Sequence, residues 1–332
     1  MTKISVLGSN SFSGSHFVDY VLSNSNWEVI GISRSPEYAE IFLPYLYKKK
    51  KSNRFNFYQM DINTDLDKII ELFNSEKPEI IVNFVAQGES GNSWKYPEDY
   101  FRTNCMGIMK LVNQLKNFDY IKKYIHISTP EVYGSTTGCM VETPNYYNPS
   151  NPYAASKAAM DLFLFSLVKN FNFPLFMTRS SNVYGMHQQL YKIIPRSIIY
   201  LKIGKKINLH NEGKTIRSFI HIKDISDGIN KIIRFGKKGN LYHFASENIM
   251  TISEVVQKIC KIMDYDFKNS VIFTSERNEQ DSIYDLDWTK AKNELSWIPK
   301  VSFEDGIKET VKWIDENWEE IKAYPLIYLH KK

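Results

Sequence analysis

Short apolar segments alternate with helical patterns over the first half of this 332-residue chain, and that alternation restricts the fold more than any other feature. The segments that predict strands are residues 4–7, 27–32, 55–60, 80–86, 123–128 and 174–179. The patterns that predict helices between them are residues 15–23, 36–47, 66–75, 100–116 and 153–170. Strands and helices in this order form a parallel, doubly wound sheet with right-handed crossovers. The sequence therefore predicts an α/β fold of the Rossmann type.

The pattern breaks into shorter pieces beyond residue 180. Helices are predicted at 193–201, 225–235, 252–263 and 303–318, and strands at 241–245 and 271–274. Open α/β sheets bind ligands at the carboxyl ends of their strands, so these pieces predict a smaller C-terminal α/β substrate lobe over that edge. We expect a dinucleotide-binding domain at residues 1–178, completed by about 218–245, and a substrate lobe at 179–217 and 246–332.

Tyr153 and Lys157 are the most informative pair of polar residues in the chain. A lone phenol is a poor base, because its reference pKa is about 10. The i, i+4 spacing on a helix places the lysine on the same face as the tyrosine. The ammonium of Lys157, together with the positive charge of a nicotinamide, would favour the phenolate. The hydroxyl of Thr129 could share the proton of a substrate alcohol while hydride leaves. This combination predicts a redox site that uses a nicotinamide cofactor.

A glycine-bearing loop at residues 8–14 joins the first predicted strand to the first helix. A helix N-terminus presents free N–H groups and the positive end of the helix dipole, which suits a pyrophosphate. Gly8 would permit the tight turn and Gly14 the close packing of helix on strand, whereas Ser11 takes the middle position of the usual three-glycine spacing. Without the Tyr153–Lys157 pair, the loop is equally consistent with an ordinary turn.

The end of the second predicted strand bears on the choice between NAD and NADP. An NAD site usually has a carboxylate there for the ribose, whereas an arginine accommodates the 2′-phosphate of NADP. This chain has Ser33, Arg34 and Ser35, which favours NADP, with NAD bound through its ribose alone as the alternative. Asp61, followed by Ile62, could reach the adenine amino group, or it could simply end the third strand.

Composition and charge exclude several classes of function. The net charge of +5 is modest and is compatible with an anionic small-molecule substrate, and it does not argue for nucleic acid. The three cysteines have no paired spacing, so we expect a reducing cytoplasm, no disulfide framework and no metal site. We see no signal peptide and no apolar run of membrane-spanning length, and we therefore expect a cytoplasmic protein.

Several motifs occur in one order along the chain. They are STPEVYG at 128–134, NPYAASK at 151–157, RSSNVYG at 179–185, KIIP at 192–195, IRSFIHIKD at 216–224 and LSWIP at 295–299. Together they resemble the extended short-chain dehydrogenase/reductases that modify nucleotide sugars, over essentially the whole chain. The nearest pattern is that of the nucleoside-diphosphate-hexose 4,6-dehydratases of the dTDP-glucose type.

The resemblance implies a reaction and a role for each catalytic residue. Such enzymes first oxidise C4 of the hexose, with Tyr153 as the base, Lys157 as its electrostatic partner and ribose ligand, and Thr129 bound to the C4 oxygen. The resulting ketone acidifies the C5 proton, which Glu131 is expected to remove. Water then leaves from C6, and hydride returns to C6.

One residue departs from the dTDP-glucose pattern. An aspartic acid between the threonine and the glutamate protonates the leaving hydroxyl in that group, and here the position holds Pro130, which has no proton to give. Some relatives that act on GDP- or UDP-sugars also lack this aspartate and rely on the glutamate or on water. The resemblance therefore implies a 4,6-dehydratase, with C4 oxidation without dehydration, by a 4-dehydrogenase or a 4-epimerase, as the alternative. A catalytically idle nucleotide sensor on the same fold is a third hypothesis.

The resemblance also implies binding residues and partners. The expected cofactor contacts are Gly8, Ser11, Phe12, Gly14, Ser33, Arg34, Asp61, Ile62, Ala86, Tyr153 and Lys157. The expected contacts of the nucleoside-diphosphate sugar are Glu89, Ser90, Thr129, Asn182, Lys192, Ile193, Arg217 and Arg277. His126 is expected to be structural. The predicted helices 100–116 and 153–170 pair subunits in this family, so a homodimer with a four-helix bundle is expected.

Overall fold

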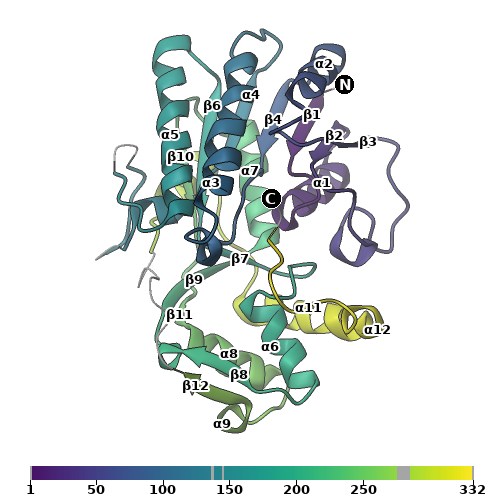
Figure 1. Cartoon of the computed structure of the whole chain (residues 1–332), viewed down its shortest axis with the longest axis vertical. Helices are drawn as coiled ribbons and strands as arrows, with labels where there is room; N and C mark the ends of the chain where they lie inside the picture. The colour runs from purple at the N-terminus through teal and green to yellow at the C-terminus, as the bar shows by residue number, and fades with distance from the viewer. Residues whose placement is uncertain (1, 136–137, 144–145, 275–284, 331–332) are drawn as a thin grey trace.

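The computed structural model describes residues 2–135, 138–143, 146–274 and 285–330, and its centre is a seven-stranded parallel sheet (Figure 1). The strand order is β10-β6-β5-β4-β1-β2-β3. The strands are β1 (Lys3–Leu7), β2 (Glu28–Ser33), β3 (Phe55–Gln59), β4 (Ile80–Asn83), β5 (Lys123–Ile127), β6 (Leu175–Ser180) and β10 (Leu241–Phe244). Ile4 of β1 lies opposite Val29 on one side and Ile80 on the other. The predicted Rossmann-type fold is confirmed.

Helices cover both faces of this sheet because its strands are apolar on both sides. On one face α1 and α7 pack through residues such as Phe17 and Ile229 against Val82 of β4. On the other face α2, α4 and α5 pack through residues such as Leu111 and Leu164. The bounds are α1 (Phe12–Asn24), α2 (Leu66–Glu76), α4 (Ile108–Leu115), α5 (Pro152–Phe171) and α7 (Ile222–Phe235). No helix in the described ranges is long and apolar enough to cross a bilayer.

The second half of the chain builds a smaller α/β lobe, seen in the lower part of Figure 1, around a separate apolar core. One sheet joins β7 (Asn182–Tyr184), β9 (Ile216–His221) and β11 (Ile249–Thr251), and a second joins β8 (Ile207–His210) to β12 (Val271–Thr274). The helices are α6 (Ile193–Lys202), α8 (Ile252–Ile262), α9 (Phe267–Ser270), α10 (Thr289–Leu295), α11 (Phe303–Glu316) and α12 (Trp318–Ile321). Ile198, Val256 and Trp313 are buried together where α6, α8 and α11 meet.

The chain then returns from this lobe to the sheet. Strand β9 leads directly into α7, which crosses the sheet face to β10. Strand β10 pairs in parallel with β6, so that Leu241 lies opposite Met177 and Phe244 opposite Ser180. A segment from beyond residue 216 therefore supplies both a covering helix and an edge strand of the first sheet. The division into a dinucleotide-binding domain (1–178 and about 218–245) and a substrate lobe (179–217 and 246–332) stays a prediction.

Two predicted helices differ from the structure. The predicted helix at 36–47 is wrong: only a 3-10 turn, η1 (Glu40–Phe42), forms there. Pro44 accounts for this, because a residue before proline is pushed out of the helical region, and Leu43 is extended, with φ −121° and ψ 93°. The predicted helix at 100–116 is divided into α3 (Pro97–Phe101), a π-helical segment, η3 (Arg102–Gly107), and α4.

Candidate active site

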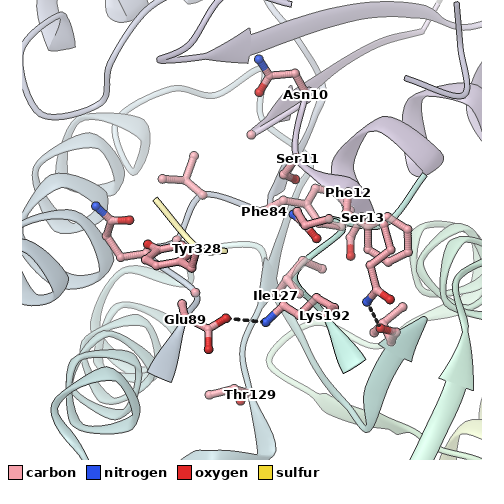
Figure 2. A pocket seen from close by; sticks show the side chains of 18 of the residues that line it. Asn10, Ser11, Phe12, Ser13, Phe84, Glu89, Ile127, Thr129, Lys192 and Tyr328 are labelled. Carbon is pink, nitrogen blue, oxygen red and sulfur yellow. Dashed lines mark hydrogen bonds and ion pairs between the residues drawn. The ribbon is translucent and has the colours of Figure 1, made fainter. Parts of the chain in front are cut away.

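One cavity of about 940 Å³ lies at the carboxyl ends of the strands, between the sheet and the lobe (Figure 2). The predicted site residues that line it are Gly8, Ser11, Phe12, Ser33, Arg34, Asp61, Ile62, Ala86, Glu89, Ser90, Thr129, Glu131, Tyr153, Lys157, Asn182, Lys192, Ile193 and Arg217. Gly14 is not among the lining residues, and Arg277 lies outside the described residues. The described residues hold no cluster of three His, Cys, Asp or Glu side chains suited to a metal ion.

The turn between β1 and α1 has the geometry of an anion site. Gly8 has a φ of +78°, which side chains disfavour, so glycine fits the tight turn. Ser11 caps α1, and its hydroxyl accepts a hydrogen bond from the Gly14 N–H at 3.1 Å. A Cβ added to Gly14 would lie 2.1 Å from the Gly8 carbonyl oxygen, so Gly14 keeps helix and strand in contact. The 13-residue helix directs its N-terminus at the cavity, which suits a pyrophosphate.

The loop after β2 is tied to the β1–α1 turn by Asn10. The Asn10 N–H donates to the Ser33 hydroxyl at 3.1 Å, and the Asn10 side chain donates to the carbonyls of Ser35 and Pro36 at 3.0 and 2.9 Å. The nearest carboxylate along the chain, Glu37, accepts hydrogen bonds from Tyr45 and Lys51. Arg34 is therefore the charged side chain of this loop that lines the cavity.

Thr129, Glu131 and Tyr153 lie together where β5 ends and α5 begins. The Thr129 hydroxyl accepts from the Glu131 N–H at 3.3 Å and caps the turn η4 (Pro130–Tyr133). Burial raises the pKa of Tyr153, and the charge of Glu131 raises it further, whereas a hydrogen bond with Thr129 lowers it. Without a bound cofactor, Tyr153 is therefore a protonated phenol, next to a hydroxyl and a carboxylate.

Lys157 is buried behind Tyr153, and only 1% of its surface is exposed. Its Nζ donates to the Ile127 carbonyl at 2.7 Å and lies 3.3 Å from His126 Nε2. Burial lowers the pKa of Lys157 to about 8, an effect that the charge of Asp161 opposes. Burial and the charge of Lys157 also lower the pKa of His126 well below its usual value, so the imidazole is neutral. His126, predicted to be structural, is thus a direct neighbour of the predicted catalytic lysine.

The opposite wall of the cavity carries the predicted sugar-nucleotide residues. Glu89 Oε2 and Lys192 Nζ form an ion pair at 2.7 Å, and Figure 2 shows it reaching from the loop after β4 to the lobe. Asn182 donates to the Ser218 carbonyl at 3.2 Å, which fixes its amide beside the cavity. Arg217, on β9, also lines this wall. An ion pair, an amide and a guanidinium-bearing residue therefore line the same cavity as Tyr153.

Sequence reasoning missed a buried asparagine that shapes this cavity. Asn104, in η3, accepts from the Gln87 N–H at 2.7 Å and donates to the Gln87 carbonyl at 3.1 Å. It also donates to Ser156 of α5 at 3.0 Å. The loop after β4 is thereby fixed to α5. Nothing in the local sequence singles out Asn104, because its partners lie 17 and 52 residues away.

The segment after α12 was also missed, and it crosses the cavity. Tyr328 lines the cavity, and its ring contacts that of Tyr191 with centroids 5.4 Å apart. Figure 2 shows Tyr328 on the same side of the cavity as Glu89. His330 then stacks on Tyr96, with centroids 4.1 Å apart, and pairs with Asp99 at 2.9 Å. The aromatic residues near the C-terminus carry no motif that predicts this path.

Comparison with known proteins places this site in a family. The family model described as GDP-mannose 4,6 dehydratase matches residues 6–310. The dTDP-glucose 4,6-dehydratase of Haemophilus influenzae is 30% identical over 336 residues, which cover 94% of this chain and 98% of the relative. A trifunctional UDP-glucose 4,6-dehydratase/epimerase/reductase of Arabidopsis thaliana is 28% identical over 95% of this chain, but the chain spans only 47% of that protein's length.

Solved structures with the same fold include both dehydratases and epimerases. DesIV, a dTDP-glucose 4,6-dehydratase from Streptomyces venezuelae solved with NAD bound, has a TM-score of 0.87 and 28% identity, and the match covers 96% of this chain and 98% of DesIV. A UDP-glucuronic acid 4-epimerase from Bacillus cereus, solved with UDP-glucuronic acid and NAD, has a TM-score of 0.85 and 26% identity, covering 95% and 99%. The chain therefore belongs to the GDP-mannose 4,6-dehydratase family, within the extended short-chain dehydrogenase/reductases that include nucleotide-sugar dehydratases and epimerases.

Proposed function

We propose that this protein oxidises C4 of a nucleoside-diphosphate hexose and then eliminates water between C5 and C6, giving a 4-keto-6-deoxy sugar. The observation that carries the proposal is the meeting of Thr129, Glu131 and Tyr153 in one cavity, opposite the helix N-terminus after β1. Thr129 and Tyr153, the two side chains that would bind and deprotonate the C4 hydroxyl, are hydrogen-bonded to each other. The family match and the likeness to DesIV support the same reaction.

The cofactor that fits is a nicotinamide dinucleotide, which when bound accepts hydride from C4 and returns it to C6. The N-terminus of α1 would hold the pyrophosphate, while Ser33 and Arg34 would hold the adenosine ribose. Arg34 and the absence of an acid between Ser33 and Pro36 support NADP, whereas the solved relatives contain NAD. Titration of both dinucleotides against the wild type and Arg34→Ala separates them: a role in 2′-phosphate binding predicts that only NADP affinity falls.

In the oxidation step, Tyr153 would take the proton of the C4 hydroxyl, and Thr129 would hold the same oxygen. The protonated Lys157 stabilises the phenolate through its positive charge. Burial makes this assistance necessary, because desolvation alone raises the pKa of Tyr153. A dinucleotide whose nicotinamide carries a positive charge would lower the pKa of Tyr153 further, so we expect the base to become active when the cofactor is bound.

In the elimination step, Glu131 would remove the C5 proton that the C4 ketone has acidified. The side-chain amide of Asn151, at the start of α5, lies 3.4 Å from Glu131 Oε2 and helps to orient it. Pro130 is buried and offers no proton. We infer that Glu131 passes the proton taken from C5 to the departing C6 hydroxide, so that the C5–H and C6–O bonds break and one water leaves. Hydride addition at C6 then requires a proton at C5, which balances the proton that Tyr153 takes from the C4 hydroxyl.

A second reading keeps C4 oxidation without elimination. Pro130 favours it, because the position of the usual proton donor carries no acid. The fold match to a UDP-glucuronic acid 4-epimerase supports it as well. On this reading the ketone is reduced again on the other face of the ring, or it is released.

Mass spectrometry of sugar-nucleotide products separates these possibilities. The protein is incubated with NAD or NADP and with dTDP-, UDP-, GDP- and CDP-hexoses in turn. Dehydration gives a product lighter by one water, oxidation alone gives one lighter by two hydrogens, and epimerisation gives an unchanged mass with a new retention time. We expect Tyr153→Phe to bind dinucleotide but to lose turnover by about 10²–10⁴-fold, the usual contribution of a general base. A Tyr153→Phe variant with wild-type turnover would rule out the proposed chemistry.

A further inference from the structure

A buried carboxylate lies directly behind the proposed catalytic residues. Asp161 is one helical turn after Lys157 on α5, on the same face, and neither Asp161 nor Arg179 of β6 has exposed surface. Asp161 Oδ2 accepts from Arg179 Nη2 at 2.8 Å and from the Ser128 hydroxyl at 2.6 Å. One carboxylate oxygen therefore joins α5, β6 and the end of β5.

The Ser128 contact reaches the reaction centre through the backbone. Ser128 immediately precedes Thr129, and its N–H donates to the Thr178 carbonyl of β6 at 2.8 Å. The hydrogen bond to Asp161 thus fixes the start of the turn that carries Thr129 and Glu131. Tyr153 lies on α5, the helix that also carries Asp161. The Asp161 carboxylate therefore fixes the position of this turn relative to the Tyr153 phenol.

The second oxygen of Asp161 faces His126, the imidazole that lies between this carboxylate and Lys157. Asp161 Oδ1 is 3.6 Å from His126 Nε2, and Lys157 Nζ is 3.3 Å from that same nitrogen. Oδ1 has no hydrogen-bond partner among the described residues. Because His126 is neutral, this one carboxylate is the anion between two buried cations, Lys157 and Arg179. The charge of Asp161 raises the pKa of Lys157, and the charge of Arg179 lowers it.

The remaining ionisable groups around this cluster lie on η4, on the loop before α5, on α5 and on β10, where His243 Nε2 is 2.7 Å from the Tyr133 hydroxyl. Tyr133 and Tyr147 stack on the Arg179 guanidinium, whose carbon lies 4.4 and 5.1 Å from their ring centroids. Arg179 also donates to the Tyr147 hydroxyl at 3.0 Å. Tyr153 and Glu131 lie on the cavity side. Burial raises the pKa of both stacked tyrosines, so they remain neutral.

We propose that Asp161 is a positioning residue for the oxidation step, which fixes the turn bearing Thr129 through Ser128 and keeps Lys157 charged beside Tyr153. This role rests on the proposed function, because it acts through the residues of that reaction. Asp161 is shielded from the cavity by these residues and is not expected to touch substrate.

Three variants test the two parts of this role. Asp161→Asn leaves two buried cations without an anion, and we expect kcat at neutral pH to fall at least about tenfold. The alkaline limb of the kcat–pH profile should also move to lower pH, by about one unit or more. Combining Asp161→Asn with Arg179→Met removes one cation, which should move the limb back towards the wild-type position. Ser128→Ala should lower kcat several-fold and leave the limb in place, because the charge remains.

A measurement without turnover keeps this test independent of the proposed reaction. The ¹³C NMR signal of the Lys157 ε-carbon, assigned by its loss in Lys157→Met, is titrated in each variant. We expect Lys157 to lose its proton at lower pH in Asp161→Asn than in the wild type. Asp224→Asn is the matched control, because Asp224 is also a buried carboxylate but accepts from the Lys300 and Val301 N–H groups far from this cluster.

The outcomes separate a positioning residue from a merely structural one. An unchanged Lys157 titration in folded Asp161→Asn, with the pH limb at the wild-type position, would overturn the charge role. Wild-type kcat in Ser128→Ala would overturn the positioning of the turn, whether or not Asp161→Asn folds. Absence of any nucleotide-sugar turnover, together with a shifted Lys157 titration, would count against the proposed function and leave the charge role of Asp161 standing.

Discussion

Tyr153, Lys157 and His126 are shielded from water beside or behind the cavity wall, and this shielding sets their protonation. Burial is the largest cause of the raised pKa of Tyr153, of the lowered pKa of Lys157 and of the neutral state of His126. A lysine that is easily deprotonated and a tyrosine that is hard to deprotonate thus lie on one face of α5. If Tyr153 is the base, as we propose, it would stay a protonated phenol until a positively charged nicotinamide binds beside it.

The lowered pKa of Lys157 predicts how stability changes with pH. Its pKa is about 8 in the folded protein, against 10.5 for the exposed side chain, so between these values the unfolded chain binds more protons. The free energy of unfolding should then rise with pH over this range, by about 1 kcal/mol per unit from this group alone. Urea unfolding at pH 7.5, 8.5 and 9.5 compares the wild type with Lys157→Met, which lacks the titrating group. Parallel curves for the two proteins would contradict the assignment.

Individual residues were predictable where their partners are close in sequence. Thr129, Tyr153 and Lys157 fall in contiguous motifs whose spacing carries a physical meaning, and all three line the cavity. Asn104 and Asp161 were not predicted, because their functions depend on partners from other strands and helices. The environment of Lys157 was likewise not predictable. The i, i+4 spacing indicates that Lys157 shares a helix face with Tyr153, but only the packed structure shows that its Nζ hydrogen-bonds the Ile127 carbonyl of β5.

At the level of elements, the start of α5 serves both stability and the site. Asn151 caps the helix, with its side chain accepting from the Ala154 N–H at 2.9 Å, and Pro152 occupies the first turn. The same side chain contacts Glu131 through its amide group. A single residue therefore begins the helix that carries Tyr153 and orients the carboxylate beside it.

This double role of Asn151 can be separated from simple capping. Asn151→Ala should lower the free energy of unfolding by about 1 kcal/mol and also reduce turnover. Ser302→Ala is the matched control, because Ser302 caps α11 with an equivalent bond from the Asp305 N–H at 3.1 Å, away from the cavity. The control should lose similar stability but keep its turnover. Equal turnover losses in the two variants, measured on folded protein, would contradict a role for Asn151 in the site.

Elements were predictable where they are long and periodic, and they were missed where they are short. Every strand of the large sheet was predicted to within a few residues, because each is a near-continuous apolar run. Among the described strands of the lobe, only β12 was predicted. The three- and four-residue strands β7, β8 and β11 were missed, since so short a segment has no periodicity to read, and the six-residue β9 was missed because polar residues interrupt its apolar pattern. Residues 36–47 are the opposite case, in which a helix was predicted that does not form. Their apolar periodicity is helical, but Pro44 prevents a continuous helix.

For the whole molecule, we propose a homodimer formed by η3, α4 and α5. Met106 of η3 and Leu162 of α5 are exposed apolar residues on neighbouring helices of one face, with 47% and 51% of their surfaces accessible. In Figure 1, α4 and α5 run side by side on the outside of the sheet. Two copies that paired these helices would bury both side chains in a four-helix arrangement.

Light scattering tests the proposed dimer. We expect the wild type to have about twice the 38.8 kDa mass of one chain, and Met106→Glu combined with Leu162→Glu to have the mass of one. Buried carboxylates without partners are costly, which is why the substitution should separate the copies. Phe273→Glu on β12 is the control, because Phe273 is similarly exposed, at 53%, but lies in the lobe. A wild type with the mass of a single chain would refute the proposal.

The return of β10 to β6 bears on how the molecule is made. During synthesis the first six strands of the chain leave the ribosome well before β10, which ends at Phe244. Until then β6 remains an open edge with unpaired N–H and C=O groups, a template for association with other chains. We therefore expect nascent polypeptides shorter than about 245 residues to recruit chaperones. The large sheet can be completed only after part of the second half of the chain has been translated, because β10 pairs with β6.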